Sequence, residues 1–523
     1  MTLYIRALVF ALLGTNLAAA YGQEPGVEPT DNTIKFNLIQ VNDVYEITPV
    51  GKEGGIAKLA TVFNAYKQVN PNTFLVIAGD FFSPSALGTA RVDGERLAGK
   101  QMVALLNTIP LYLATFGNHE FDVSEAQFQQ RLGESEFGWV SSNVTDANGQ
   151  AFQKVERNRI QVIESGGQRL RVGYFGVTIP SNPTKYVKYT DFMEEAANQV
   201  RELRPKVDVL IALTHLAYED DMRIARSFPE IDMILGGHEH EKHRIEIASL
   251  PGIYKADANA RSVFVHELAF DPITRKLRKN STLRPLGADI PEDPTVKAEV
   301  DKWVKIAFDG FRKDGFNPEA KVADVSTALD GHESSVRNGP TELTKIIADG
   351  MLAAAPRSEI AIYNAGSIRI DDMIQPGVVT EYDVIRILPF GGKIASIQVT
   401  GAYLKRILAQ GIANKGQGGY LQTAGVTYNG DQPMHNGEAI NDGRVYTIAI
   451  NDFLLTGNEQ NFGWLKREGN PEITVLKEHP DIRNATIAEL KRRFGQQNSS
   501  WSLAWENPFS ILLHGLVDRV ASR

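Results

Sequence analysis

Residues 111–122 read LYLATFGNHEFD and join a short apolar run to a polar turn. The apolar run predicts a β-strand over residues 111–116. Gly117 opens the turn, and Asn118 and His119 follow it, so an amide and an imidazole lie just beyond the strand. In open α/β sheets, ligands bind beyond the carboxyl ends of the strands. The segment therefore predicts an α/β fold with a polar site at one edge of its sheet.

Further short apolar runs predict strands elsewhere in the first half of the chain, at residues 36–41, 74–78, 172–177, 209–213 and 233–235. A helix is predicted between the first two strands, over Ile56–Val69, because apolar residues recur there at helical spacing. Asn70 and Pro71 end that helix. Strands that alternate with helices imply a layered α/β architecture.

Side chains that bind metal ions follow five of these predicted strands. They lie in the segments NDVYE, AGDFF, GNHEFD, LTHLA and GGHEH, and they are Asp43, Asp80, Asn118, His119, His215, His238 and His240. Two metal ions about 3.5–4 Å apart need a bridging ligand, and a carboxylate can bridge. Imidazole and carboxylate ligands suit zinc, manganese or iron. A lone GD or a lone histidine after a strand is usually structural, but the five segments together predict a metal site.

The order of these segments resembles that of the calcineurin-like metallophosphatases, and specifically of the 5′-nucleotidase family. The resemblance implies a four-layer sandwich that carries two metal ions. One ion would be bound by Asp43, Asp80 and His240. The second would be bound by Asp80, Asn118, His215 and His238, with Asp80 as the bridge.

The same resemblance assigns His119 as the catalytic histidine and Asp122 as the carboxylate that orients it. One position departs from the family pattern, because Tyr45 stands where the family usually has a histidine. Tyr45 could bind a hard ion as a phenolate, could lie unligated beside the ion, or could weaken the first site. We expect a modified but working site, since every other ligand position is retained.

The second half of the chain contains three segments that resemble the family's nucleotide-binding loops. YNAGSIR (363–369) supplies Asn364 and Arg369, LPFGG (388–392) supplies Phe390, and NDFLLTGNEQNF (451–462) supplies Phe453. Two aromatic rings that clamp a base tolerate any base, and arginine suits phosphate or vicinal hydroxyls. The alternative for both phenylalanines is a place in the hydrophobic core.

Two further positions in this half match the family pattern less closely. Glu459 stands where the family usually has an aspartate that contacts the ligand. Arg337, in SSVRNGPTEL, resembles an arginine found early in the family's second domain. We include both residues among the expected substrate-binding residues.

The chain of 523 residues is long enough for two domains. Residues 291–313 predict a charged amphipathic helix between two α/β regions, and strands are predicted in the second region at 360–363, 394–399 and 445–450. The expected organisation is a metallophosphatase domain over residues 33–288, a linker helix over 289–316 and a C-terminal α/β nucleotide-binding domain over 317–523.

The first 20 residues resemble a secretory signal peptide. Arg6 precedes the apolar run 7–13, and Ala18 to Ala20 offer a cleavage site. The alternative is a membrane anchor, but this run is too short to span a bilayer. The absence of cysteine fits a periplasmic or secreted bacterial protein without disulfides.

Composition narrows the range of possible substrates and binding partners further. The net charge of −8 argues against a nucleic-acid groove, so an anionic substrate would be held by metal ions or a few arginines. The expected function is hydrolysis of nucleoside 5′-monophosphates by an exported phosphomonoesterase, a monomer or weak dimer without a membrane anchor. The alternatives are a 2′,3′-cyclic-nucleotide phosphodiesterase with 3′-nucleotidase activity, a UDP-sugar hydrolase, or a nucleotide-binding protein that has lost turnover through Tyr45.

Overall fold

The central strands of the first half bury both of their faces, and their apolar residues alternate between two cores. In β1 (Ile34–Val41), Phe36 and Leu38 belong to one core, and Ile39 and Val41 belong to another. Strand β12 (Val209–His215) divides its residues in the same way. This alternation follows from the two-residue period of a strand, and it places a layer on each face of each sheet. The computed structural model describes residues 33–495, so the predicted signal peptide lies outside the described residues.

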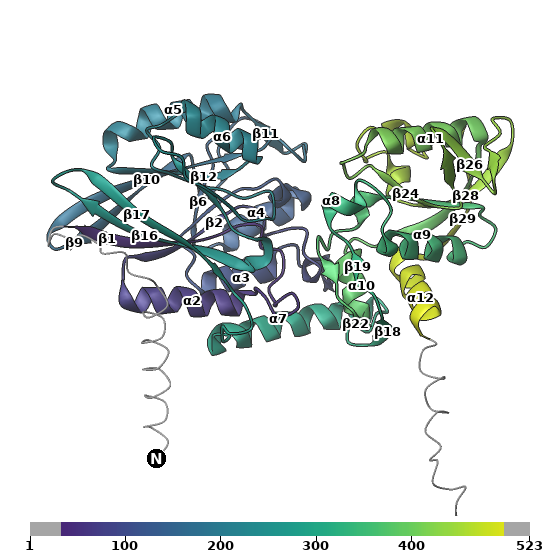
Figure 1. Ribbon diagram of the computed structural model, residues 1–523, viewed down its shortest axis with the longest axis horizontal. Coiled ribbons are helices and arrows are strands. Elements are labelled where there is room, and N and C mark those ends of the chain that lie inside the picture. Colours follow the sequence, from purple (N-terminus) through teal and green to yellow (C-terminus); the bar gives the residue numbers. More distant parts are fainter. Residues whose placement is uncertain (1–32, 496–523) are drawn as a thin grey trace, which may run out of the picture.

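Two sheets lie face to face in the first half (Figure 1). The seven-stranded sheet has the order β17-β16-β1-β2-β5-β6-β8. Its other strands are β2 (Thr73–Ala78), β5 (Leu113–Thr115), β6 (Gly138–Val140), β8 (Val155–Glu156), β16 (Ser262–Asp271) and β17 (Lys276–Pro285). The six-stranded sheet has the order β14-β15-β13-β12-β10-β9. Its other strands are β9 (Asn158–Ser165), β10 (Gln168–Thr178), β13 (Met233–Leu235), β14 (His243–Ile245) and β15 (Gly252–Lys255).

Helices cover the outer face of each sheet and complete four layers. The seven-stranded sheet is covered by α2 (Ile56–Val69), α3 (Lys100–Thr108) and α4 (Glu125–Glu134). The six-stranded sheet is covered by α5 (Phe192–Leu203) and α6 (Tyr218–Ser227). Short strand pairs lie at the periphery: β3 (Arg91–Val92) with β4 (Glu95–Arg96), and β7 (Val144–Asp146) with β11 (Val187–Tyr189). The predicted layered α/β fold and four-layer sandwich are confirmed.

The predicted strands and the helix over residues 56–69 all occur in this half. One prediction was too long, because the strand expected over residues 111–116 spans only Leu113–Thr115. Beyond Thr115 the backbone turns to side-chain partners: Thr178 Oγ1 donates to the Phe116 carbonyl at 2.7 Å, and Gly117 N donates to Glu120. The ladder therefore ends where the polar turn begins.

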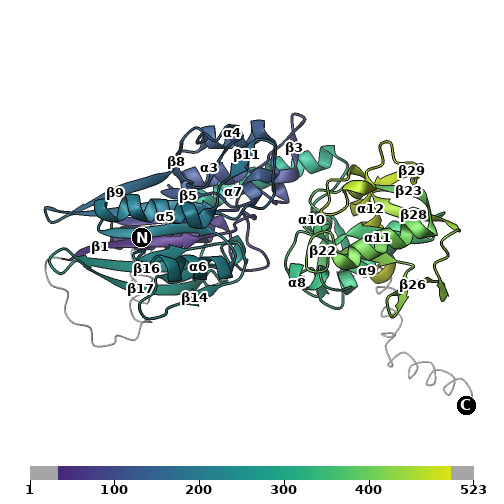
Figure 2. The same ribbon diagram turned by 90° about the horizontal axis from the view of Figure 1, so that it is seen from above.

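The predicted linker helix is α7 (Pro294–Lys313). It begins three residues later than expected, because the Asp293 carboxylate caps it by accepting hydrogen bonds from Thr295 N and Val296 N, each at 3.0 Å. Val300 and Trp303 pack into the same core as α2 and α3. The helix thus lies against the first domain and leads the chain to the second (Figure 2).

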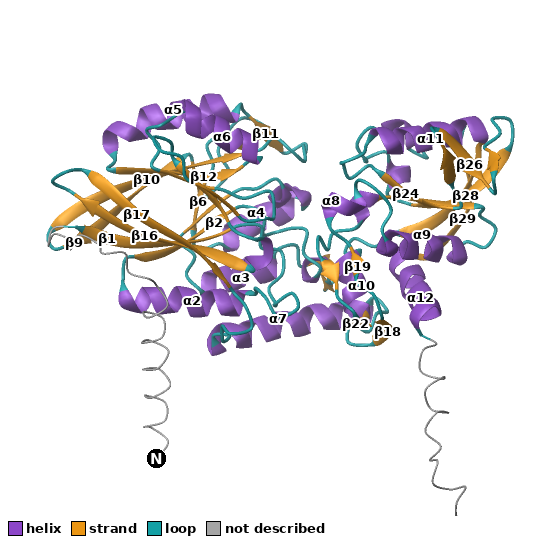
Figure 3. Cartoon of the chain, viewed as in Figure 1, coloured by secondary structure: helices purple, strands orange, loops and turns teal. Residues whose placement is uncertain are grey.

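The second half forms a smaller α/β domain beside the first (Figure 3). Its five-stranded sheet has the order β24-β20-β28-β23-β29. The strands are β20 (Ile360–Asn364), β23 (Lys393–Thr400), β24 (Leu421–Ala424), β28 (Val445–Asn451) and β29 (Thr474–Asp481). Helices α9 (Glu342–Ala354) and α12 (Ile482–Phe494) pack on one face, and α11 (Gly401–Ala413) packs on the other.

Shorter elements of this domain lie around that sheet. The helices are α8 (Glu333–Val336) and α10 (Glu381–Ile387). The strands are β18 (Lys321–Val325), β19 (Leu329–Asp330), β21 (Met373–Ile374), β22 (Gly377–Thr380), β25 (Thr427–Asn429), β26 (Gln432–His435) and β27 (Glu438–Ala439). Figure 1 shows α8, α10 and β19 on the side that faces the first domain.

Candidate metal centre

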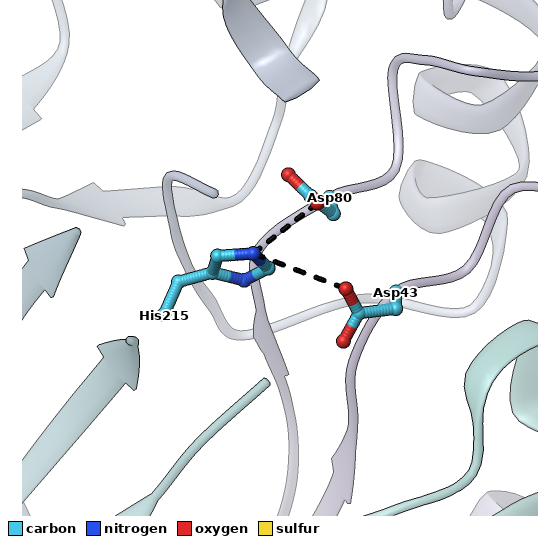
Figure 4. Close-up of side chains that lie close together, drawn as sticks. All are labelled: Asp43, Asp80 and His215. Atoms are coloured by element: carbon cyan, nitrogen blue, oxygen red, sulfur yellow. Dashed lines mark ion pairs between the residues drawn. The ribbon is translucent and has the colours of Figure 1, made fainter. Parts of the chain in front are cut away.

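The carboxyl ends of parallel strands bring Asp43, Asp80 and His215 together. Strands β1 and β2 are parallel neighbours, and β12 belongs to the facing sheet. His215 Nε2 lies 3.2 Å from Asp80 Oδ2 and 3.9 Å from Asp43 Oδ1, as Figure 4 shows. All three side chains are buried. One ligand atom from each falls within 4.8 Å of the others, which is a spacing that suits a metal ion.

Four of the predicted ligands have left-handed backbone conformations. The φ angles are 52° for Asp43, 58° for Asp80, 95° for His238 and 61° for His240. Residues other than glycine rarely adopt these φ angles. Backbone strain of this kind is found mostly at functional sites. The turns after β1, β2 and β13 thus bend sharply and aim the ligand side chains back over the strand ends.

Glycines allow these turns to pack closely. A Cβ atom at Gly117 would lie 2.1 Å from Asp80 Oδ1. A Cβ atom at Gly237 would lie 2.5 Å from the Ala78 carbonyl oxygen. Neither position has room for a side chain, so the backbone itself forms the wall of the site.

The Glu120 carboxylate holds the Asp80 turn in place. Its Oε2 accepts hydrogen bonds from Asp80 N at 2.8 Å and Gly117 N at 2.6 Å. Its Oε1 accepts from Phe81 N at 2.7 Å and Phe82 N at 3.1 Å. Burial and the charge of Asp80 raise the pKa of Glu120 to about 7, against the effect of these N–H donors. Four donors on two oxygens match an ionised carboxylate, which has no proton of its own.

Hydrogen bonds also orient Asp43 and His215. Asp43 Oδ2 accepts from Asn42 Nδ2 at 2.8 Å and from His238 N at 2.9 Å, which leaves Oδ1 facing the site. His215 Nδ1 lies 2.8 Å from the Ala78 carbonyl, to which it can only donate. This contact sets the tautomer in which Nε2 carries a free lone pair, the form that binds metals.

The Tyr45 hydroxyl lies among three of the predicted ligands. It is 2.9 Å from His240 Nε2, 3.1 Å from Asp80 Oδ2 and 3.3 Å from Asp43 Oδ1. Burial, followed by the charges of Asp80 and Asp43, raises the pKa of Tyr45 well above its usual value. The phenol is therefore directed into the group of Asp43, Asp80 and His240.

His119 lies beside this group and is oriented by a carboxylate. Its Nδ1 is 2.6 Å from Asp122 Oδ2, and its ring makes an edge contact with the ring of Tyr45 at 6.3 Å. Asn182 Nδ2 donates to the other Asp122 oxygen at 2.8 Å. Burial acts to lower the pKa of His119, but the charges of Asp122 and Asp80 outweigh it and raise the pKa. The imidazole thus presents Nε2 away from Asp122.

His238 and His240 follow β13 in one turn. The rings of His238 and His215 make an edge contact with centroids 5.3 Å apart. Burial, together with the charge of His215, lowers the pKa of His238 to about 3, which keeps its imidazole neutral. His240 Nδ1 contacts Asp371 Oδ2 at 2.6 Å, and Asp371 belongs to the second domain. The two domains therefore meet at a predicted metal ligand.

The predicted substrate arginines lie on the second-domain side of this contact. Arg337 forms an ion pair with Glu333, and Arg369 Nη1 lies 3.9 Å from Glu333 Oε1. The Nε atoms of both arginines are buried and have no hydrogen-bond partner. Two guanidinium groups with unused donors at one place can bind an anion.

The other predicted substrate residues fall into two groups. Asn364 Nδ2 donates to Glu459 Oε2 at 2.6 Å, so these two residues interact directly. Phe390 and Phe453 are 38% and 42% exposed, which rules out the core alternative for both. Their loops are adjacent. The backbone N–H of Lys393, which follows the loop of Phe390, donates a hydrogen bond to Oδ2 of Asp452, which precedes Phe453, at 3.0 Å. The guanidinium of Arg369 lies 5.7 Å from the ring centre of Phe390.

A small cleft lies between the domains. Tyr45, Glu46 and His240 line it from the first domain, and Arg369 and Asp371 line it from the second. The cleft therefore runs from the predicted metal ligands to a predicted substrate arginine.

Two buried polar atoms indicate that the predicted metal ligands are suited to bind metal ions. Among the described residues, Asn118 Oδ1 and His215 Nε2 are buried and have no hydrogen-bond partner. Most buried polar atoms in proteins have a hydrogen-bond partner, so these two unpartnered atoms within one group of predicted ligands are available to bind a metal ion. A carbonyl oxygen and an imidazole nitrogen beside two buried carboxylates form a donor set that suits divalent cations. The residues present fit the metal ions that the resemblance implies.

Sequence reasoning missed three residues of this site: Glu120, Asn182 and Asp371. Glu120 lies inside the GNHEFD segment, so an acidic residue within a ligand turn was a usable signal. Asn182 and Asp371 reach the site from distant loops, and nothing in their local sequence marks them.

Comparison with known sequences agrees with this geometry. Residues 36–242 match the family model of the calcineurin-like phosphoesterases, and residues 321–467 match that of the 5′-nucleotidase C-terminal domain. The four-layer sandwich, with carboxylate and imidazole groups at its strand ends, defines a metallophosphoesterase. The chain belongs to the 5′-nucleotidase family, whose members are metal-dependent hydrolases of phosphoric esters.

Individual relatives support the same assignment. The chain is 30% identical to the trifunctional nucleotide phosphoesterase protein YfkN of Bacillus subtilis over 82% of its own length, but it spans only 32% of that relative. It is 25% identical to the 5′-nucleotidase of Bos taurus, covering 81% of this chain and 82% of that protein. The structure of a 5′-nucleotidase precursor from Thermus thermophilus shares the fold, with a TM-score of 0.71 at 22% identity. The match covers 88% of this chain and 96% of that one.

Between residues 33 and 495, no helix has both the length and the apolar character needed to cross a bilayer.

Proposed function

We propose that the protein is an exported phosphomonoesterase that hydrolyses nucleoside 5′-monophosphates to nucleoside and phosphate. The observation that carries this proposal is the cleft between the domains. It is lined on the first-domain side by Tyr45 and His240, whose side chains contact each other and whose neighbours are Asp43 and Asp80, and on the second-domain side by Arg369. A nucleotide needs both sides, because its phosphate must reach the metal ligands while the nucleoside is held by the second domain.

In this proposal two sets of residues hold two divalent ions, of zinc, manganese or iron. The first set is Asp43, Asp80, His240 and, where its hydroxyl ionises, Tyr45. The second set would be Asp80, Asn118, His215 and His238, so that Asp80 would belong to both sets. Ions bound there supply an activated water at neutral pH and neutralise charge on the phosphate oxygens.

The chain's own groups then act on the phosphate. His119, whose pKa is raised by Asp122 and Asp80 against the effect of burial, would donate a hydrogen bond from Nε2 to a phosphate oxygen or a proton to the leaving ester oxygen. Asn182 keeps the Asp122 carboxylate in line with the imidazole. These three residues hold the proton donor at a fixed place beside the ligand group.

The nucleoside would be held by the second domain. Phe390 and Phe453, both exposed and on adjacent loops, offer faces for stacking a base. Arg337 and Arg369 have unused buried donors for the phosphate or ribose side. Asn364 and Glu459 form one hydrogen-bonded pair, suited to contact a sugar or a base edge.

A substrate panel on the purified full chain tests this proposal. We expect release of phosphate from AMP and other 5′-monophosphates when manganese, zinc or iron is added. Preferential hydrolysis of 2′,3′-cyclic nucleotides or of UDP-glucose would replace the proposed substrate with one of the alternatives. Absence of turnover with every ion, together with retained nucleotide binding, would leave only a nucleotide-binding protein.

The bridging role of Asp80 is tested in the same experiment. Asp80→Ala should lose both ions and nearly all activity, as measured by elemental analysis and phosphate release. Two ions still bound in this variant would contradict the bridge.

A further inference from the structure

The contact between His240 and Asp371 joins the two domains at the edge of the metal centre. His240 follows β13 of the first domain, and Asp371 follows the Arg369 loop of the second. The 2.6 Å distance between Nδ1 and Oδ2 is that of a strong hydrogen bond to a carboxylate. The side chains are 18% and 24% exposed, so water competes little for either atom.

The direction of this bond has a consequence for the other ring nitrogen. A carboxylate can only accept, so His240 donates its Nδ1 proton to Asp371. When the ring is neutral, as metal binding requires, Nε2 carries the lone pair, and Nε2 is the atom that faces Asp43 at 3.7 Å and the Tyr45 hydroxyl at 2.9 Å. The second domain thus sets the tautomer and orientation of a first-domain side chain.

Asp371 is itself held rigidly on the side of the second domain. Its Oδ1 accepts from Glu333 N at 2.8 Å, and its φ of 39° is in the left-handed region. The carboxylate of Glu333 pairs with Arg337 and lies 3.9 Å from Arg369. A continuous chain of contacts therefore runs from His240 through Asp371 and Glu333 to the two arginines.

We propose that Asp371 is a positioning residue through which the second domain strengthens ion binding at His240. This inference rests on the proposed function, since it assumes that His240 binds an ion. A domain arrangement without the contact would leave the imidazole free to rotate and to exchange tautomers. The first ion would be held more weakly in that arrangement. Ion affinity and domain arrangement are then linked, and each favours the other.

The neighbouring Asp372 offers a matched control. It also spans the interface, because Arg261 Nη1 of the first domain lies 3.6 Å from Asp372 Oδ1, but no contact joins it to a predicted ligand. The interface has further contacts that should keep the domains docked in either variant. Tyr382 Oη donates to Glu46 Oε2 at 3.2 Å, and apolar residues of both domains share one core.

The test measures ion binding rather than turnover. Dissociation constants for zinc and manganese are determined by chelator competition on the full chain, for the wild type and for Asp371→Ala, Asp371→Asn and Asp372→Asn. We expect Asp371→Ala to weaken one of the two ions by about 10–100-fold, the usual effect of losing the partner of a ligating histidine. Asp371→Asn should recover part of this loss, because its amide oxygen can still accept from Nδ1. Asp372→Asn should bind both ions as the wild type does.

The outcomes separate this proposal from the one on which it rests. A wild type that binds no ion contradicts the proposed function itself. If Asp371→Ala binds both ions with wild-type affinity, the coupling is overturned but the proposed function is not. If ion binding is weakened equally in Asp371→Ala and Asp372→Asn, the effect is due to domain docking. If Asp371→Ala fails to fold, Asp371→Asn decides the question: weakened binding of one ion supports the proposal, and unchanged binding overturns it.

Discussion

Exchange of Glu120 for glutamine changes one oxygen to an NH₂ group and leaves the side chain the same size. In the structure both oxygens of Glu120 accept two backbone N–H groups each. A glutamine has only one acceptor oxygen, so whichever way its amide turns, two buried N–H groups face a donor. One orientation abandons Asp80 N and Gly117 N, and the other abandons Phe81 N and Phe82 N.

The magnitude follows from this count. A buried donor left without a partner costs about 1–3 kcal/mol, so two cost roughly 2–6 kcal/mol of stability. For a domain of this size, each kcal/mol lowers the melting temperature by about 2–4 °C, which gives a decrease of roughly 4–24 °C for Glu120→Gln. The Asp80 turn should also move, because its N–H is one of the four donors, so the content of bound ions should decrease.

The assay is thermal unfolding of the full chain followed by circular dichroism, with elemental analysis of the same samples. Glu125→Gln serves as the matched control, since it is the same chemical change five residues away at an exposed position on α4. A melting temperature and ion content equal to those of the wild type in Glu120→Gln would refute the role assigned to Glu120. A similar decrease in Glu125→Gln would show that the effect is not specific to the contacts of Glu120.

The remaining predictions concern residues of the metal centre and of the proposed nucleotide-binding loops. His119→Asn should lower kcat by about 10²–10⁴-fold with unchanged metal content, and loss of an ion would make His119 a ligand instead. Phe390→Ala or Phe453→Ala should weaken nucleotide binding by roughly 1–3 kcal/mol yet spare hydrolysis of p-nitrophenyl phosphate, whereas equal damage to both substrates would contradict base stacking. Tyr45→Phe should weaken the first ion site and remove any phenolate-to-iron absorption if the hydroxyl ligates, and wild-type metal content, spectrum and rate would make Tyr45 a packing residue. Tyr45→His should keep or raise activity with zinc or manganese, and a large loss would show that the site depends on the phenol.

The sequence predicted the fold and the residues that gather at the strand ends because both depend on local pattern. Apolar runs define the strands, and polar residues just after parallel strands must meet at one edge of the sheet. This rule brings Asp43 and Asp80 together, and His215 joins them from the end of a strand in the facing sheet. The exposure of Phe390 and Phe453 also agrees with their position in glycine-flanked loops rather than in the core.

The supporting residues were not predictable in the same way. Glu120 acts on backbone N–H groups of another turn, 38–40 residues away in the chain. Asp371 acts across a domain interface at a separation of 131 residues from His240. Neither role leaves a periodic or compositional trace, because each depends on how distant loops are packed against one another.

The backbone strain of the centre shows how folding and chemistry compete at these turns. Asp43, Asp80, His238 and His240 occupy a region of φ that glycine adopts freely, and other residues there cost of order 1–3 kcal/mol each. Glycine at these four positions would relax the turns but remove two carboxylates and two imidazoles from the site. The surrounding contacts offset the strain: Glu120 holds the Asp80 turn, the Asp43 side chain accepts from His238 N, and Asp371 holds His240. The strained turns of the metal centre therefore depend on these contacts together. Asp371 belongs to the other domain, yet its contact helps to keep His240 in place.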